Sequence, residues 1–236
     1  GADHIKIGAC GGLDDPSGEI WHLQFTEEEI RAIVEECEDR GTYVMAHCEH
    51  GRGAKRATEC GVRTIEHGLY LNKEIVKLMK EKGTYFVPTM LVYYHFVKRA
   101  KEAGATDEFI RKVMQPMGPE EGSCLESQMR AVELAHREGV VIGLGTDMGP
   151  FLPYQLGMEF KLKTECGITP YDAIKSGTIV NAEICQLEDK IGSIEVGKWA
   201  DIIAVEGKPD EDIERLAEPA NVMLVMKKGD VFKNTL

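Results

Sequence analysis

The chain of 236 residues has little basic charge and no long apolar run. Its 28 Lys and Arg residues are outnumbered by 40 Asp and Glu residues, so its formal charge is −12. Nucleic acids and anionic membranes both require a basic surface, so we expect neither as a partner. No apolar run reaches the ~18 residues of a membrane span, and the start does not resemble a signal peptide. This balance favours a small-molecule substrate.

The chain also lacks the cysteine patterns of a disulfide scaffold or a zinc ribbon. It has seven cysteines, an odd number, and no two of them form a CxxC motif. This usage is typical of reduced thiols, so we expect a cytoplasmic protein. An apolar content of 43% is sufficient for a core. The chain begins with Gly1-Ala2-Asp3 and runs directly into the strand-like HIKIG, so we expect it to be part of a longer polypeptide.

Two histidines end two neighbouring apolar runs. The first run, residues 43–46, leads to His47, and the second, residues 62–65, leads to His67. The helical segment between them ends at Gly61, so the pattern predicts strand, helix, strand. Carboxyl ends of parallel strands meet on one rim, and neutral imidazole is the commonest metal ligand. The pair therefore predicts a metal site, although either histidine alone is more often a hydrogen-bonded structural residue.

The rest of the chain alternates strand-like and helix-like segments. A strand over residues 4–10 carries Lys6, and the long loop that follows it is a candidate substrate lid. Helices are predicted from Thr26 to Arg40, over 72–82, over 125–138 and from Thr169-Pro170, with strands over 84–90 and 140–147. Residues 91–121 form an irregularly helical connection. After Lys190, short strands and a hairpin turned at 228–230 predict a small β unit, giving domains 1–190 and 191–236.

Polar residues at the ends of successive strands define the fold class. The intervals are 47 − 6 = 41, 67 − 47 = 20 and 147 − 67 = 80 residues, the last of which spans two β/α units. A (β/α)8 barrel uses roughly 30 residues per unit. We therefore predict an α/β fold that consists of the C-terminal part of a (β/α)8 TIM-like barrel, about its last five strands, plus strands of a small β-sandwich domain.

The motifs around these residues resemble those of the amidohydrolase superfamily. They are GADHIKIGACGG, AHCEHG, GVRTIEHG, VPT, GLGTDMG, ITPYDAIKSGTIVNAE and IGSIEVGKWADIIAV, in that order along the chain. Within the superfamily the chain looks like the branch of prolidase-like and Xaa-Arg dipeptidases, close to zinc-dependent carboxypeptidases. The resemblance implies hydrolysis of the amide bond of a dipeptide or N-acyl amino acid by a metal-bridging hydroxide.

The resemblance also implies roles for individual residues. Lys6 would be carboxylated to a carbamate that bridges two divalent metal ions, most simply zinc. His47 and His67 would bind one metal ion and Asp147 the other, and Asp147 would also carry the proton from the attacking hydroxide to the leaving amine. The His-x-His pair that the family has on its first strand does not precede Lys6, and Glu49 stands where relatives have His or Tyr.

Residues just beyond the strand ends are candidates for binding the substrate carboxylate. They are Tyr70, Tyr93, Tyr94, His95, Trp21 and His22. The alternative for the aromatic cluster at 93–95 is helix packing. Two alternatives to the peptide substrate stay open, a cyclic amide as in imidazolonepropionase-like relatives and a catalytically inactive scaffold. We further expect a homo-oligomer.

Overall fold

The structure is a computed structural model that describes residues 1–15, 18–99, 101–102, 104–117, 120–148 and 155–236. Pro16 and Ser17 of the predicted lid loop lie outside the described residues. The chain divides into two units, Gly1–Ile142 and Gly143–Leu236. Each unit is described by itself below.

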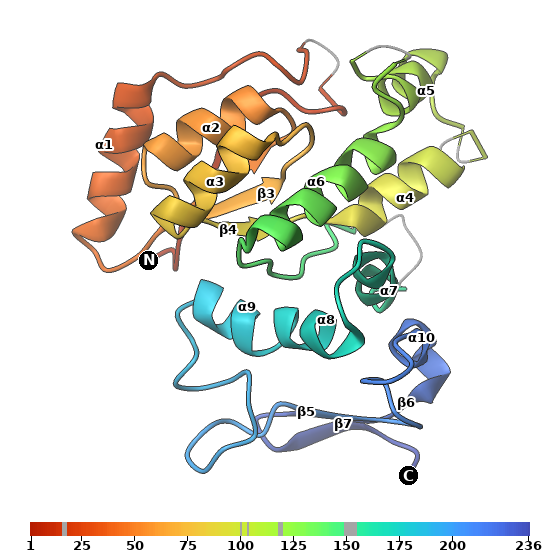
Figure 1. The fold of residues 1–236 in the computed structure, drawn as a ribbon. Helices are drawn as coiled ribbons and strands as arrows, with labels where there is room; N and C mark the ends of the chain where they lie inside the picture. Colours follow the sequence, from red (N-terminus) through yellow and green to blue (C-terminus); the bar gives the residue numbers. More distant parts are fainter. Residues whose placement is uncertain (16–17, 100, 103, 118–119, 149–154) are drawn as a thin grey trace. The chain divides into compact units, whose positions relative to one another are not determined.

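A parallel sheet of four strands forms the centre of the first unit (Figure 1). The strands lie in the order β1 (Ile5–Gly8), β2 (Val44–Cys48), β3 (Thr64–His67) and β4 (Tyr85–Val87), and each neighbouring pair is parallel. The intervening helices are α1 (Glu27–Glu38), α2 (Gly51–Glu59) and α3 (Lys73–Lys82). Sequential strands are thus spatial neighbours joined by helices. This confirms a mixed α/β fold with a parallel sheet, consistent with part of an amidohydrolase TIM barrel.

One face of this sheet is apolar and is covered by the helices. Side chains alternate along a strand, and in β2 Val44, Ala46 and Cys48 are all buried. The helices contribute their own buried residues, among them Ile30 of α1 and Met79 of α3. Burial of these apolar side chains drives the packing of helix on sheet.

The helix ends follow the predicted local signals. Thr26 and Glu29 form a capping box at the start of α1, where the sequence predicted a helix to begin. Asn72 caps α3, which ends at Gly83 in the left-handed conformation with φ 70°. In the same way Thr169 caps the helix that begins with Pro170. The predicted starts of these three helices are confirmed.

The predicted strand over residues 140–147 does not form as a strand. Its contact with the sheet is a single parallel bridge between Ile142 and Phe86, with a hydrogen bond from the Phe86 N–H to the Val141 carbonyl. Farther along, the backbone groups of Leu144 bond to the side chain of Asn181 and not to a strand. The described sheet therefore has four strands and one bridge, where the sequence predicted about five strands.

The connection after β4 contains two helices, α4 (Met90–Arg99) and α5 (Asp107–Met114), and leads to α6 (Cys124–Glu138). α4 packs on both α5 and α6, and α6 also packs on α3 (Figure 1). The predicted irregular helical connection is therefore an elaborated β/α loop that starts at the same rim as the two histidines.

The second unit contains short helices and one antiparallel sheet. The helices are α7 (Met158–Glu165), α8 (Pro170–Ser176), α9 (Ile179–Ile184), α10 (Glu214–Ala217) and the 3-10 helix η1 (Pro219–Asn221). The sheet has the order β5 (Ile202–Val205), β6 (Val222–Lys227) and β7 (Asp230–Asn234), and the hairpin at 228–229 is where the sequence predicted it. A β-sandwich and a domain boundary near Lys190 stay predictions. Among the described residues, no helix has the length and apolarity needed to cross a membrane.

Candidate metal centre

The face of the parallel sheet opposite the apolar one carries polar side chains. The register pairs Lys6 with Met45, Gly8 with His47, and His47 with Glu66. Because side chains alternate and paired residues share a face, Lys6, His47 and Glu66 lie on the same face. Glu66 is buried and accepts a 2.5 Å hydrogen bond from the hydroxyl of Thr64. The alternation of these strands thus places a cation, an imidazole and a carboxylate together.

His67 joins this group through an unusual backbone conformation. The register pairs it with Cys48, whose side chain belongs to the apolar face. Regular alternation would turn its ring toward the helices, but His67 has φ 71°. The ring instead lies against His47, with centroids 4.6 Å apart and an interplanar angle of 69°. A non-glycine residue with positive φ costs about 1–3 kcal/mol, so the surrounding structure must hold His67 in place.

Two hydrogen bonds hold His67. Its Nδ1 lies 2.8 Å from the hydroxyl oxygen of Thr89, which itself has φ 53°. Its carbonyl accepts a 2.8 Å hydrogen bond from the side-chain amide of Gln128 on α6, which also donates to the Pro88 carbonyl. The bond at Nδ1 leaves Nε2 as the ring nitrogen for a metal, the arrangement common among histidine ligands.

The surroundings favour the neutral form of His67. The ring is 3% exposed, and burial lowers its pKa well below 6.5, with further lowering by the charges of His47 and Lys6. An imidazole must be neutral to bind a metal ion. His67 is therefore in its ligand form at neutral pH, and Lys6 is near enough to act on it electrostatically.

The loop after β1 passes close to His47. A Cβ atom built on Gly12 would lie 3.4 Å from His47 Nε2, so the backbone of the loop approaches the ring closely. The loop folds back on itself through a 2.9 Å bond from the Gly11 N–H to the His22 carbonyl and a bridge between Cys10 and Leu23. A Cβ at Gly12 would reach van der Waals contact with His47 and would lie only 2.7 Å from Asp14 Oδ1, so glycine leaves room for both side chains.

A buried Glu49–Tyr93 pair connects three segments of the rim. The Glu49 carboxylate, 5% exposed, accepts a 2.6 Å hydrogen bond from the Tyr93 hydroxyl and a 2.5 Å bond from the Leu13 N–H. The Tyr93 ring, 1% exposed, also contacts His67 edge to face at 6.0 Å. Tyr93 thus contributes to the packing around His67, and its hydroxyl is engaged with Glu49.

The other predicted substrate residues are distributed along the same rim. Tyr70, with φ 58°, has its ring 5.9 Å from that of His50, and its N–H donates a 3.3 Å hydrogen bond to the Ser127 hydroxyl. His95 is buried on α4 next to Tyr94, and in the described structure neither of its ring nitrogens has a partner. Their role in substrate binding stays a prediction.

Trp21 and His22 lie in the loop after β1. Trp21 lines a cavity together with His50, whereas the Nδ1 of the exposed His22 accepts a weak 3.4 Å bond from the Glu19 N–H. His22 is thus engaged within its own loop, and Trp21 faces a space that a ligand could occupy.

Asp147 belongs to the second unit, so the structure does not fix its distance to the histidines. Its backbone has φ 49°, a positive value like those of His67 and Thr89. The segment that leads to it is held by side chains. Asn181 bonds both backbone groups of Leu144, at 2.9 Å to its N–H and 2.7 Å to its carbonyl, and Lys163 donates to the Gly143 carbonyl.

Lys163 is itself unusual because it is fully buried. It also donates a 2.9 Å hydrogen bond to the Ser176 hydroxyl. Burial lowers its pKa to about 8, while the nearby carboxylate of Glu159 acts in the opposite direction. A buried lysine near a buried carboxylate therefore anchors the start of the Asp147 segment.

In the part of the chain that the structure describes, no three His, Cys, Asp or Glu side chains converge to hold a metal ion. The first unit supplies two histidines and a lysine, so a complete centre requires modified Lys6, Asp147 or further ligands. Several residues that hold a candidate ligand or the segment leading to it were not among the sequence predictions. Thr89 was detectable as a polar residue at a strand end, whereas Gln128, Asn181 and Lys163 had no comparable signal.

Comparisons with known proteins show the family of this chain. The model of the amidohydrolase family matches residues 1–232, and the chain belongs to this family. The ochratoxinase of Aspergillus niger is 34% identical over 235 residues, which are 99% of this chain and 47% of that protein. The chain thus spans about half the length of the curated relatives it matches.

Two solved structures are similar over nearly the whole chain. A prolidase complexed with N-methylphosphonate-L-proline is 36% identical with a TM-score of 0.89, and the match covers 99% of this chain and 55% of that one. A Xaa-Pro dipeptidase with methionine bound in its active site is 38% identical with a TM-score of 0.82, again over 99% and 55%. Amide-bond hydrolases are therefore the relatives of this chain.

Proposed function

We propose that this protein is a metal-dependent hydrolase that cleaves the amide bond of a dipeptide or an N-acyl amino acid. The observation that carries the proposal is the pair of adjacent imidazoles, His47 and His67, near the ends of neighbouring parallel strands. Similarity to prolidase, Xaa-Pro dipeptidase and ochratoxinase supports the amide as the bond that is cleaved.

The residues present would supply part of the ligand set for a pair of divalent metal ions, with zinc as the simplest choice. His67 is neutral and offers Nε2, His47 lies beside it, and Lys6 shares the polar face. Lys6 would serve as a carbamate, because an ammonium group would repel cations whereas a bridging anion offsets their mutual repulsion. Bound metal ions would polarise the scissile carbonyl and lower the pKa of the attacking water.

The residues of the chain divide the remaining tasks. Asp147 would accept the proton of the attacking water and deliver it to the leaving amine, the role of a general base and then a general acid. Thr89 and Gln128 hold His67 in its left-handed conformation, so that its ring stays turned toward His47. Asn181 and Lys163 hold the segment that ends in Asp147.

Metal analysis of Lys6→Ala tests the proposal. We expect purified wild-type protein to contain two equivalents of metal, and Lys6→Ala to lose at least one equivalent and most of its activity. Short carboxylic acids should restore part of both, because they replace the bridging anion. Lys55→Ala is a matched control, since this lysine is paired with Glu74 on the surface. Full metal content in Lys6→Ala would refute the bridge.

A substrate panel separates the proposed reaction from its alternative. Dipeptides and N-acyl amino acids are compared with cyclic amides under the same conditions. We expect hydrolysis of the linear amides. Turnover of cyclic amides alone would favour the imidazolonepropionase-like alternative, and no turnover at full metal occupancy would favour an inactive scaffold.

A further inference from the structure

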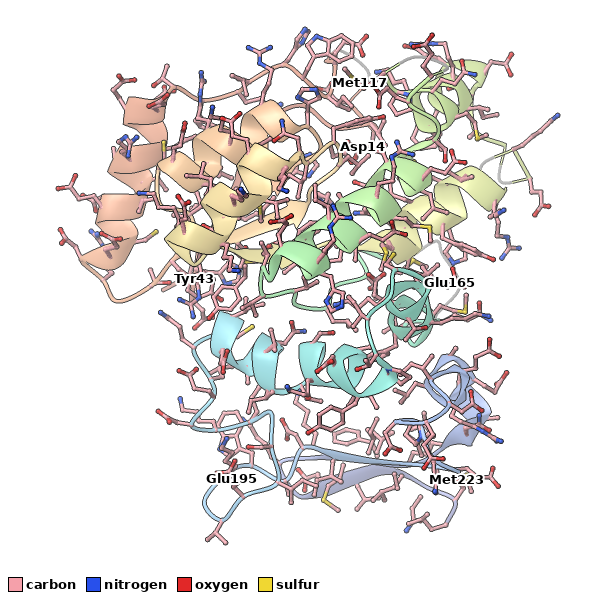
Figure 2. All side chains as sticks on the ribbon, viewed as in Figure 1. Asp14, Tyr43, Met117, Glu165, Glu195 and Met223 are labelled. Carbon is pink, nitrogen blue, oxygen red and sulfur yellow. The ribbon has the colours of Figure 1, made fainter. Side chains whose placement is uncertain are left out.

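The start of helix α6 contacts the chain around three residues in left-handed conformation. Among the described residues of the first unit, those with positive φ that are not glycine are His67 at 71°, Tyr70 at 58° and Thr89 at 53°. Such a backbone is costly and persists only where neighbouring groups hold it. Two adjacent buried residues of α6, Ser127 and Gln128, supply these groups. Figure 2 shows the side chains of α6 among those of α3 and α4, on which the helix packs.

Gln128 is the contact that reaches a candidate metal ligand. Its amide nitrogen donates to the His67 carbonyl at 2.8 Å and also to the carbonyl of Pro88, the residue before Thr89. Both neighbours are acceptors, so the amide must turn its nitrogen toward them. The amide oxygen is buried and has no hydrogen-bond partner in the described part of the chain. An unpaired buried acceptor is costly, so the two bonds from the nitrogen have to offset that cost.

Ser127 makes a separate contact. Its hydroxyl accepts a 3.3 Å hydrogen bond from the Tyr70 N–H. Tyr70 follows His67 by three residues and is not a candidate metal ligand. The helix thus holds the His67 backbone through Gln128 and the Tyr70 backbone through Ser127.

The conformation of His67 has a defined alternative. Regular alternation would turn its ring to the face of its pairing partner Cys48, which is fully buried. Helix α2 packs on β3, so the ring could occupy that face only if the packing loosened. In the structure the ring instead lies beside that of His47, with the centroids 4.6 Å apart. A docked Gln128 and a His67 ring beside His47 therefore belong to the same state of the first unit.

We propose that docking of α6 through Gln128 and metal binding at His67 stabilise each other. The inference rests on the proposed function, in which His67 is a metal ligand. Docked Gln128 holds the His67 backbone so that the ring stays beside that of His47, and a metal ion bound to the ring favours the same backbone conformation. Such coupling is reciprocal, so docking raises metal affinity by the same factor by which metal favours docking. Gln128 is thus a positioning residue for the metal centre.

The zinc affinities of two neighbouring variants test the coupling. Gln128→Met keeps the length of the side chain and removes the donor, so zinc binding should weaken about tenfold in competition with a chromophoric chelator. Ser127→Ala is the matched control, because it removes the bond to Tyr70 and leaves the His67 carbonyl paired with Gln128. Its zinc affinity should stay close to that of wild type.

A double-mutant cycle separates this coupling from a general loss of structure. In His67→Gln the ligand is absent, so adding Gln128→Met should not weaken the remaining zinc binding any further. A general disturbance would weaken zinc binding by the same factor in both backgrounds. Wild-type zinc affinity in Gln128→Met, or an equal loss in both backgrounds, would overturn the proposal.

Hydrogen exchange tests the reciprocal effect in the wild-type protein, so no variant has to fold. The Ser127 N–H reports opening of the start of α6, since it donates to the Ser123 carbonyl at 3.0 Å. Saturating zinc should slow its exchange about tenfold, the factor expected for zinc affinity. The Ile30 N–H at the start of α1, bonded to the Thr26 carbonyl, is the internal reference and should not respond. Exchange at Ser127 that zinc leaves unchanged would contradict the coupling.

Amide hydrolysis is measured separately, so that failure of the coupling and failure of the proposed function can be told apart. Zinc binding that depends on Gln128, without hydrolysis of dipeptides, would reject the proposed function alone. Hydrolysis by a protein whose zinc affinity is the same with and without the Gln128 amide would reject the coupling alone. A wild-type protein that binds no zinc would reject both.

Discussion

Replacement of Asn181 by leucine should release the segment that carries Asp147. The Asn181 side chain substitutes for a neighbouring strand, because its Oδ1 accepts from the Leu144 N–H at 2.9 Å and its Nδ2 donates to the Leu144 carbonyl at 2.7 Å. Leucine has a similar size but can make neither bond. A backbone group left without a partner costs about 1–3 kcal/mol, and these groups are only part-buried, so we use about 1–1.5 kcal/mol for each group. The two bonds together then contribute about 2–3 kcal/mol.

Hydrogen exchange measures this loss directly. Because about 1.4 kcal/mol corresponds to a tenfold change in the equilibrium constant for local opening, exchange of the Leu144 amide should be about 30- to 150-fold faster in Asn181→Leu. The kcat should fall as well, since Asp147 follows Leu144 by three residues and is held at φ 49°. Asn181→Asp keeps the acceptor for the N–H and should give an intermediate rate, and exposed Glu188→Gln should change neither quantity. Wild-type exchange at Leu144 in Asn181→Leu would refute the reasoning.

Two further predictions concern buried titratable groups. Lys163→Met removes the cation next to the buried Glu159, so the free energy of unfolding measured in urea titrations should fall by about 3–5 kcal/mol. Adding Glu159→Gln to this variant should restore part of the loss. A Lys163→Met variant as stable as wild type would contradict this prediction. Burial lowers the pKa of His67 and His95 below 6.5, so on acidification the unfolded chain takes up protons before the folded chain does. The free energy of unfolding of the metal-free protein should therefore decrease as the pH falls below about 6.5. Urea titrations at several pH values in the presence of a chelator test this. His95→Gln should make the free energy of unfolding depend less steeply on pH. An unchanged pH dependence in this variant would show that His95 does not contribute.

The sequence alone determined the features that depend on neighbouring residues. The caps at Thr26, Asn72 and Thr169, and the hairpin at 228–229, were predictable because their hydrogen bonds join residues a few positions apart. The strand ends at His47 and His67 were predictable from two apolar runs that stop at the same kind of residue. The position of the histidine pair followed from the way parallel strands end on a common rim.

The tertiary structure decided how those residues are oriented and what surrounds them. Periodicity would turn the His67 ring toward the helices, and only φ 71°, held by contacts from Thr89 and Gln128, turns it toward His47. Glu49 meets Tyr93 across 44 residues, and Arg52 shares a cavity with Arg111 across 59. Such contacts depend on how separate β/α units pack, and the order of residues along one unit contains no signal of the partner that another unit will supply.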